Sequence, residues 1–257
     1  MKTFLLDLDG TMYRGTELIP SAKRFIERCQ KENIPYIFLT NNAMRTRHEN
    51  VIHMEKMGYQ NLKDADFFNS AMAASKYVRR KYNFRRAYYI GGAGMKQALL
   101  EENFEIVDTD PEVVFVGLDK TMTYSDYSKA LGYLLNGAIL VGTNEDRVLA
   151  KPGGFEIGNG SVVAMFEYAS GQKSPHISKP YSPILELCLE QFGLKKEDVI
   201  LVGDNLETDI KLGYTNDVET IFVETGVHTR NDLVNFDVKP THIIHTLDDI
   251  DLREFKK

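Results

Sequence analysis

The eight residues Phe4–Thr11, with the sequence FLLDLDGT, carry two acids near the end of an apolar run. A run of this length predicts a short buried strand, which we place at Phe4–Leu8. Side chains two positions apart on a strand point to the same side, so Asp7 and Asp9 are expected to face the same way. Neighbouring carboxylates repel each other unless a cation or a phosphate reaction uses them. A turn would explain the same residues, because Asp and Gly are common in turns, and the eight residues alone leave both interpretations open.

The 257-residue chain has the composition of an ordinary globular protein, with 43% hydrophobic and 26% charged residues. This length is ample for one large domain or two modest ones. The net charge of -6 argues against a partner that is a nucleic-acid polymer, because a phosphate backbone needs clustered Lys and Arg. An acidic protein can still bind one small phosphorylated molecule through a local lysine and backbone amides.

The two cysteines, Cys29 and Cys188, fall at apolar positions of predicted helices. We therefore expect buried thiols and neither a disulfide nor a metal pair. The chain enters its first strand without a basic-then-apolar signal, and no apolar run approaches the length of a membrane span. These features predict a cytoplasmic protein with no membrane partner.

Strand and helix patterns alternate along the chain, which predicts an α/β fold with a parallel sheet and covering helices. The first alternation includes a strand at Tyr36–Thr40, and the same kind of pattern resumes near the end of the chain with a strand at Val199–Gly203. Between them a second alternation forms an inserted module. We therefore predict one α/β domain from residues 1–75 and 178–257 and an inserted α/β domain at 76–177. The glycine-rich segment Lys151–Gly160 is predicted to be a loop.

Polar residues follow several predicted strands of the outer domain. Ligands bind beyond the carboxyl ends of the strands in an open parallel sheet. The candidates at those ends are Asp7, Asp9, Thr40, Asn41, Asp204 and Asp209. Helix caps and turns would explain each of them separately. Together they place three or four carboxylates at one edge, which requires a cation, and oxygen ligands of this kind indicate Mg²⁺.

A phosphate group also needs a positive partner, and Lys179 stands just before the helix that leads into the strand Val199–Gly203. A solvated surface lysine is the alternative. In the inserted module, Thr143, Asn144 and Asp146 follow a predicted strand and are candidate contacts to the substrate. Ordinary hydrogen-bonded loop residues are the alternative for these three.

Four segments in this order resemble the four motifs of the haloacid dehalogenase superfamily. They are Asp7–Thr11, Thr40–Asn41, Lys179–Pro180 and Gly203–Asp209. The sequence is most similar to the NagD-like, p-nitrophenyl-phosphatase-like branch, which carries a type IIA α/β cap between the second and third motifs. The segments GTN at 142–144 and GNGS at 158–161 add to this resemblance. It implies a Rossmann-like parallel-sheet core with an inserted α/β cap domain. Ser178 stands where Gly often precedes the lysine, which is a small departure.

The resemblance implies an enzyme that hydrolyses small phosphomonoesters of the nucleotide or sugar phosphate class, with Mg²⁺ and an aspartyl-phosphate intermediate. The resemblance implies that Asp7 is the nucleophile and Asp9 the general acid and base. Asp7, the Asp9 carbonyl and Asp204 would be metal ligands, and Asp209 would orient a metal-bound water or Lys179 without binding the metal itself. The implied phosphate-binding groups are Thr40, Asn41 and Lys179. A small phosphorylated metabolite is the implied partner. The resemblance also implies a homodimer formed through the cap, since members of this family commonly dimerise in that way.

Other functions remain open at this point. A phosphotransferase or phosphomutase would use the same aspartyl-phosphate. A signalling module phosphorylated on an Asp is disfavoured, because that family has a much shorter chain and does not explain Asp9 beside Asp7. A true dehalogenase is also disfavoured, because such an enzyme needs neither the second acid, Asp9, nor Mg²⁺. The sequence does not name the substrate.

Overall fold

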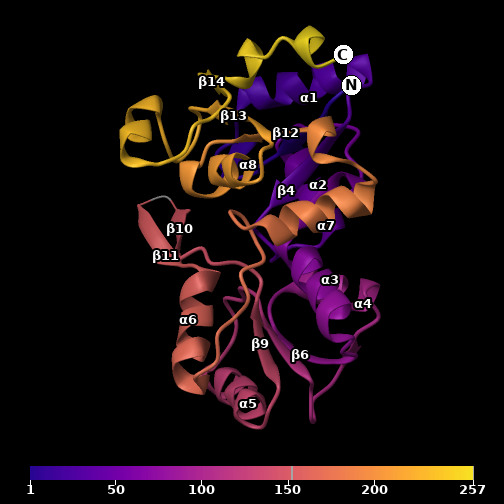
Figure 1. Cartoon of the computed structure of the whole chain (residues 1–257), viewed down its shortest axis with the longest axis vertical. Helices are drawn as coiled ribbons and strands as arrows, with labels where there is room; N and C mark the ends of the chain where they lie inside the picture. Colours follow the sequence, from indigo (N-terminus) through magenta and orange to yellow (C-terminus); the bar gives the residue numbers. More distant parts are fainter. Residues whose placement is uncertain (152, 257) are drawn as a thin grey trace. The chain divides into compact units, whose positions relative to one another are not determined.

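The computed structural model describes residues 1–151 and 153–256, and it contains two compact units, each built on its own sheet (Figure 1). The first unit comprises Met1–Thr40, Arg47–Phe68 and Cys188–Lys257, and the second comprises Asn41–Thr46 and Asn69–Leu187. The second unit begins a few residues before the predicted boundary at 75/76 and ends about ten residues after the one at 177/178. The assignment of the two units as a core and a cap stays a prediction.

The first unit contains a six-stranded sheet in the order β14-β13-β12-β1-β4-β5. Its strands are β1 (Thr3–Leu6), β4 (Tyr36–Thr40), β5 (Phe67–Asn69), β12 (Val199–Gly203), β13 (Glu219–Val223) and β14 (His242–Ile244). β1 pairs in parallel with both β4 and β12, and β13 pairs in parallel with β12 and β14. The predicted α/β fold with a parallel sheet is confirmed.

Helices and short turns complete the first unit. The helices are α1 (Pro20–Glu32), α2 (Arg47–Lys56) and α8 (Lys211–Thr215), and α7 (Ser182–Phe192) passes from the second unit into the first. A hairpin, β2 (Tyr13–Arg14) and β3 (Glu17–Leu18), follows β1, and six short helical turns are η1 (Asp64–Asp66), η2 (Lys196–Asp198), η3 (Leu206–Ile210), η4 (Arg230–Asn235), η5 (Leu247–Asp249) and η6 (Leu252–Phe255).

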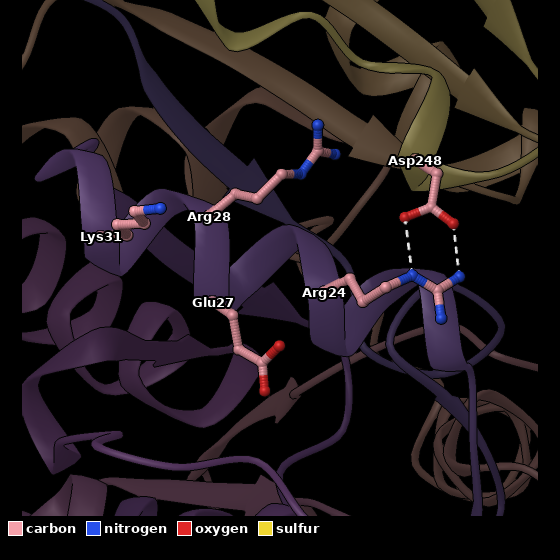
Figure 2. A pocket seen from close by; sticks show the side chains of 5 residues that line it. All are labelled: Arg24, Glu27, Arg28, Lys31 and Asp248. Atoms are coloured by element: carbon pink, nitrogen blue, oxygen red, sulfur yellow. Dashed lines mark hydrogen bonds and ion pairs between the residues drawn. The ribbon is translucent and has the colours of Figure 1, made fainter.

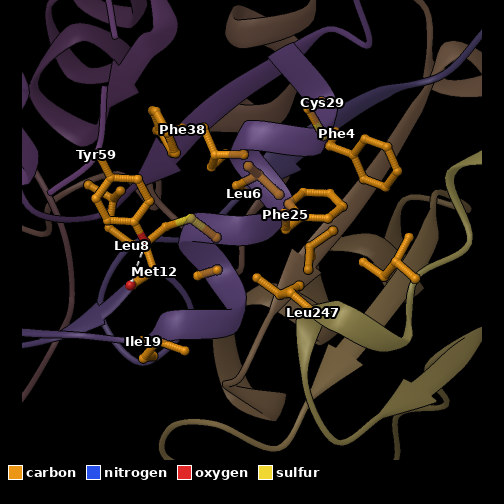
Figure 3. Close-up of a cluster of buried hydrophobic side chains, with 14 of the residues drawn as sticks. Phe4, Leu6, Leu8, Met12, Ile19, Phe25, Cys29, Phe38, Tyr59 and Leu247 are labelled. Carbon is orange, nitrogen blue, oxygen red and sulfur yellow. Dashed lines mark hydrogen bonds between the residues drawn. The ribbon is translucent and has the colours of Figure 1, made fainter. Parts of the chain in front are cut away.

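Helix α1 illustrates how the sequence builds the apolar core of this unit. It begins at Pro20, whose fixed φ suits a first helical turn, and it is capped by Asn33, which adopts the left-handed conformation with φ 53°. Its buried face carries Phe25, which meets Phe4 of β1 edge to face with ring centroids 5.2 Å apart (Figure 3). Burial of aromatic rings of this size contributes strongly to stability. The core thereby fixes β1, the strand that leads to Asp7.

The opening strand is shorter than predicted. β1 ends at Leu6, and just beyond it the Asp7 N–H still donates to the Val202 carbonyl of β12 at 2.9 Å. Asp9 lies in the turn that follows, where the Leu8 carbonyl accepts the N–H of Met12 at 2.8 Å. Gly10 has φ 87°, a conformation that favours glycine. The strand periodicity therefore does not apply to the two acids: Asp7 is half-buried and Asp9 is exposed. The segment is both a turn and the carrier of the acids.

The second unit is built on a four-stranded parallel sheet in the order β7-β6-β8-β9. Its strands are β6 (Arg86–Ile90), β7 (Glu105–Ile106), β8 (Val113–Val116) and β9 (Ile139–Gly142), and its helices are α3 (Ser70–Tyr82), α4 (Ala93–Glu101), α5 (Tyr124–Leu135) and α6 (Asn159–Ser170). Val114 and Leu140 of the sheet pack with Phe166 of α6 in an apolar cluster. The second unit thus has its own core.

The predicted loop over Lys151–Gly160 is wrong in part, because the segment contributes to an antiparallel hairpin. Its strands are β10 (Val148–Lys151) and β11 (Gly154–Ile157), and residue 152 lies outside the described residues. Phe155 and Ile157 are both exposed. The glycines of this segment favour a loop, and each strand of the hairpin is only four residues long.

Two simpler expectations concern thiols and membranes. Cys29 and Cys188 are both buried and free, as predicted. Among the described residues, none of the helices is long and apolar enough to cross a membrane.

Candidate active site

Three carboxylates come together in the first unit. Asp7 follows β1, Asp204 follows the neighbouring strand β12, and Asp209 lies in η3 just beyond. Because β1 and β12 are paired in parallel, with Leu6 opposite Val202, their carboxyl ends lie at the same edge of the sheet. One oxygen from each acid lies within 4.8 Å of the other two. This donor set suits a hard divalent cation such as Mg²⁺.

Asp204 is the most enclosed of the three acids, with no exposed surface. Its Oδ1 accepts the hydroxyl of Thr11 at 3.0 Å, and its Oδ2 accepts the N–H of Val227 at 2.6 Å. Burial, followed by the nearby charge of Asp7, raises the pKa of Asp204 to about 7, and the two donors act in the opposite direction. A cation would compensate the buried charge, so this environment fits a metal ligand.

Glycines make room for two of these acids. A Cβ at Gly226 would lie 1.9 Å from Oδ2 of Asp204, and one at Gly10 would lie 2.3 Å from the same atom. A Cβ at Gly203 would lie 2.3 Å from the Cβ of Asp209. Only Gly10 has a left-handed φ, so the other two glycines are required for space and not for backbone conformation.

A second polar cluster lies within the second unit and is centred on Asn41. The Asn41 Oδ1 accepts the backbone N–H of Lys179 at 3.0 Å, and its Nδ2 donates to the Lys179 carbonyl at 3.1 Å. The same Nδ2 donates to Oδ1 of Asp146 at 3.2 Å. Lys179 is only 3% exposed, so the alternative of a solvated surface lysine is wrong. The Asn41 side chain therefore holds the Lys179 backbone in place.

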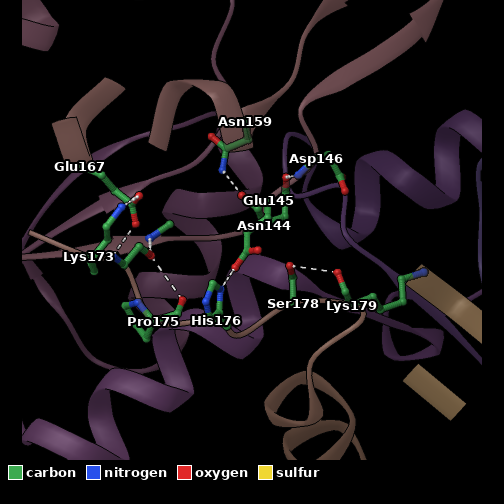
Figure 4. A network of polar contacts seen from close by, with 12 residues as sticks. Asn144, Glu145, Asp146, Asn159, Glu167, Lys173, Pro175, His176, Ser178 and Lys179 are labelled. Carbon is green, nitrogen blue, oxygen red and sulfur yellow. Dashed lines mark hydrogen bonds and ion pairs between the residues drawn. The ribbon is translucent and has the colours of Figure 1, made fainter. Parts of the chain in front are cut away.

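The three candidate substrate contacts of the inserted module belong to the same cluster, and Figure 4 shows two of them, Asn144 and Asp146, near Lys179. Thr143 is fully buried and its hydroxyl accepts Nδ2 of Asn159 at 3.1 Å, while Asn144 donates to the Asn41 carbonyl at 2.9 Å. Burial raises the pKa of Asp146, and Asn41 and the charge of Lys179 oppose that change. These contacts describe a hydrogen-bonded loop, and the role of the three residues toward substrate stays a prediction.

The remaining predicted residues are placed as follows. Thr40 is the last residue of β4, next to β1 in the six-stranded sheet, and is buried. Asp9 is exposed and its carboxylate is not among the three that come together. The first unit thus brings together Asp7, Asp204 and Asp209, and the second brings together Asn41, Lys179, Asn144 and Asp146. Their catalytic and binding roles stay predictions.

Sequence reasoning missed the residues that hold Asp204. Thr11 belongs to the first motif but received no role of its own, and Gly226 and Val227 received none. A signal was present, because β13, like the other strands, is followed by polar residues, Glu224 and Thr225, and then by a glycine. That strand is adjacent to β12 in the sheet, which the sequence alone did not reveal.

A surface pocket of about 330 Å³ lies on α1 and η5 of the first unit (Figure 2). It is lined by Arg24, Glu27, Arg28, Lys31 and Asp248. Arg24 pairs with Asp248 through two hydrogen bonds, and Arg28 donates to the carbonyls of Leu247 and Ile250. The arginines therefore fasten the C-terminal segment to α1.

Comparison with known proteins gives a consistent result. The haloacid dehalogenase-like hydrolase model matches residues 4–105, and a second HAD-hydrolase-like model matches residues 176–250. An acid sugar phosphatase of Staphylococcus saprophyticus is 34% identical over 257 residues, which is 100% of this chain and 98% of the relative.

Solved structures agree. NagD from Escherichia coli K-12 superposes with a TM-score of 0.89 at 29% identity and covers 98% of this chain and 99% of its own. A single mutant of the thermostable NPPase from Geobacillus stearothermophilus gives a TM-score of 0.87 at 36% identity, with 96% of this chain and 97% of the other covered.

The chain therefore belongs to the haloacid dehalogenase-like hydrolases. Within that family it is a NagD-like enzyme, and its activity is that of a phosphatase.

Proposed function

We propose that this phosphatase hydrolyses small phosphomonoesters with the help of Mg²⁺ and through an aspartyl-phosphate on Asp7. The observation that carries the proposal is the cluster of Asp7, Asp204 and Asp209, with ligand oxygens within 4.8 Å of one another. Asp7, the Asp9 carbonyl and Asp204 would hold the ion. When bound, Mg²⁺ neutralises charge between an anionic nucleophile and a phosphate dianion.

The acids divide the reaction between them. The Asp7 carboxylate attacks phosphorus, the bond from phosphorus to the leaving oxygen breaks, and the phosphoryl group is carried on Asp7. Asp9 donates a proton to the leaving oxygen and then accepts one from the water that hydrolyses the intermediate. Its exposed position beyond β1 supports this role, because the group must exchange protons. Asp209 orients a metal-bound water or Lys179 and does not bind the metal itself. Its Oδ2 accepts the N–H of Asn205 at 3.4 Å.

Phosphate binding is assigned to Thr40, Asn41 and Lys179 on the strength of the family motifs. The Asn41 side chain is already bonded to the Lys179 backbone and to Asp146, which supports binding of phosphate through the Asn41 backbone. Lys179 supplies the positive charge that a phosphoryl group needs. Of the three candidates after β9, Thr143 and Asn144 are buried and Asp146 is half-buried, so Asp146 is the best candidate for a contact to substrate.

We assign residues 1–75 and 178–257, which include Asn41 and Lys179, as the catalytic core and residues 76–177 as the inserted cap, which in this family contacts the leaving group. The staphylococcal relatives are acid sugar phosphatases, which favours sugar phosphates as the first substrate class to test, with nucleotides second. A phosphotransferase remains the alternative, and product analysis with acceptor alcohols separates the two. A non-enzymatic signalling module is excluded by the phosphatase assignment.

The test is a phosphatase screen over sugar phosphates, nucleoside monophosphates and p-nitrophenyl phosphate, with Mg²⁺ and with EDTA. We expect turnover of at least one class that EDTA abolishes and Mg²⁺ restores, and loss of turnover in Asp7→Asn. Activity that EDTA leaves unchanged would contradict the metal assignment. A near-native rate in Asp7→Asn would contradict the nucleophile.

A cytoplasmic location and a homodimer remain predictions. Light scattering of the purified protein measures the mass of the assembly and decides the second of them.

A further inference from the structure

A loop that no sequence motif predicted reaches the acids from a third strand. Residues 224–229, which we call the clasp loop, follow β13, the neighbour of β12 in the sheet. The loop lies in the first unit with Asp7, Asp204 and Asp209. Its residues contact the two segments that follow β1 and β12, and these segments carry the three acids.

Four hydrogen bonds join the clasp loop to those segments. The Val227 N–H donates to Oδ2 of Asp204 at 2.6 Å, and the His228 N–H donates to the Asp204 carbonyl at 3.3 Å. The His228 Nδ1 accepts the N–H of Leu206, the first residue of η3, at 3.2 Å. On the other side, the Thr225 hydroxyl donates to the Gly10 carbonyl at 2.8 Å. One short loop therefore links both segments.

The ends of the clasp loop are themselves fixed. The Glu224 N–H donates to the Ile244 carbonyl at 3.1 Å, and the Glu224 carboxylate accepts the Arg230 N–H at 2.7 Å and its guanidinium at 2.8 Å. Arg14 donates from Nε to the Thr225 carbonyl at 2.7 Å. A loop held at both ends and in the middle presents its donors in a constant position.

Gly226 leaves the space into which Asp204 fits. A Cβ at this position would lie 1.9 Å from Oδ2 of Asp204, closer than any real contact. Its φ is not in the left-handed region, so the backbone itself would accept an alanine. The absence of a side chain at Gly226 therefore serves the carboxylate.

We propose that the clasp loop positions the Asp204 carboxylate, through Val227 N–H and the space at Gly226, so that it binds the divalent cation tightly. Thr11 and Val227 each occupy one oxygen of Asp204 with one donor and so fix its rotamer. Asp204, held in this way, would bind the ion together with Asp7, and Asp209 lies close to both carboxylates. Thr225 keeps the Gly10 turn, and with it the Asp7 segment, in register with Asp204. The inference rests on the proposed cation site and adds residues that position it without touching the ion.

The test measures Mg²⁺ binding directly. Metal-stripped wild type, Gly226→Ala, Thr225→Val and Thr225→Ser are titrated with Mg²⁺ by calorimetry, and their thermal unfolding is followed in EDTA and in Mg²⁺. We expect Gly226→Ala to weaken Mg²⁺ binding by at least about tenfold, since Asp204 must leave its two donors. Thr225→Val, which loses one buried hydrogen bond, should weaken it about threefold to tenfold, and Thr225→Ser, which keeps the hydroxyl, should bind nearly as wild type.

Matched controls separate positioning from general destabilisation. Gly213→Ala places a Cβ 2.1 Å from Cγ2 of Thr220, and Thr220→Val removes a buried hydroxyl that accepts the Thr241 N–H at 3.0 Å. Both controls should lower the unfolding temperature in EDTA and leave the Mg²⁺ dissociation constant within about twofold of wild type.

The outcomes distinguish the two proposals. A wild type that binds no Mg²⁺ overturns the cation site and the clasp loop together. A wild type that binds Mg²⁺, with Gly226→Ala and Thr225→Val binding equally well, overturns the clasp loop alone. If Gly226→Ala does not fold, the Thr225→Val and Thr225→Ser pair decides: equal affinities for the pair contradict the proposal, and a difference that serine restores supports it.

Discussion

Replacement of Asn41 by alanine tests whether this side chain acts on the reaction by holding Lys179. The change removes three hydrogen bonds, two to the Lys179 backbone at 3.0 and 3.1 Å and one to Asp146 at 3.2 Å. Lys179 is buried, so its backbone groups lose partners that water cannot easily replace. Leaving a buried polar group unsatisfied costs about 1–3 kcal/mol. Because the three bonds share one side chain, we take about 3 kcal/mol as the total cost and not their sum.

Part of this cost appears in catalysis if Lys179 binds the phosphoryl group. A loss of about 2–3 kcal/mol in transition-state stabilisation lowers kcat/KM by about 30-fold to 150-fold. The assay is steady-state hydrolysis of p-nitrophenyl phosphate, accompanied by urea unfolding of each variant. Gln172→Ala is the matched control, because Gln172 also makes three bonds to backbone groups of the second unit, with Leu134, Ala138 and Leu140. It should lose comparable stability and keep kcat/KM within about threefold of wild type.

A double-mutant cycle with Lys179→Ala then locates the effect. If Asn41 acts through Lys179, the double variant should be about as slow as Lys179→Ala alone. A folded Asn41→Ala protein with kcat/KM within threefold of wild type would refute the reasoning. So would losses that multiply in the double variant, since they would mean that the two residues act independently.

Three further predictions follow from buried groups of the first unit and of α7. Tyr59→Phe should lower the free energy of unfolding by about 1–2 kcal/mol in urea, because the Met12 carbonyl loses the buried hydroxyl that donates to it at 2.7 Å; an unchanged midpoint would contradict this. Burial raises the pKa of the Cys29 thiol to about 12 and also raises that of Cys188. Neither thiol should therefore react with a thiol reagent at pH 8 until urea unfolds the protein. Rapid labelling of the native protein would contradict the burial of these two residues. The folded pKa of Asp204, about 7, lies above its usual value of 3.8, so the metal-free protein binds a proton on folding between these two pH values. The free energy of unfolding in EDTA should therefore fall as pH rises from about 4 to 7, by up to ~1.4 kcal/mol per pH unit. Asp204→Asn should lack this pH dependence, and identical pH profiles for both proteins would contradict the assignment.

Local patterns in the sequence predicted the strands well where burial was uniform. Tyr36–Thr40 and Val199–Gly203 were predicted with their observed bounds, because each is a continuous apolar run that ends in polar residues. The hairpin of β10 and β11 was not predicted, because its strands have only four residues each and the glycines of the segment Lys151–Gly160 are typical of loops. The ordered motifs likewise pointed to the acids, since side chains at the carboxyl ends of parallel strands share one edge.

The sequence by itself determined the α/β class, the family motifs, and the choice of Asp7, Asp9 and Asp204 as candidate metal ligands with Asp209 near them. These depend on residue type and on spacing along the chain. Only the tertiary structure decided that oxygens of Asp7, Asp204 and Asp209 lie within 4.8 Å of one another, and that Asp9 lies in a turn beyond β1. It also decided the surroundings of Asp204, because Gly226 and Val227 come from β13, a strand that joins the sheet beside β12. Contacts between residues so far apart in order depend on which strands pair, and no local pattern records that.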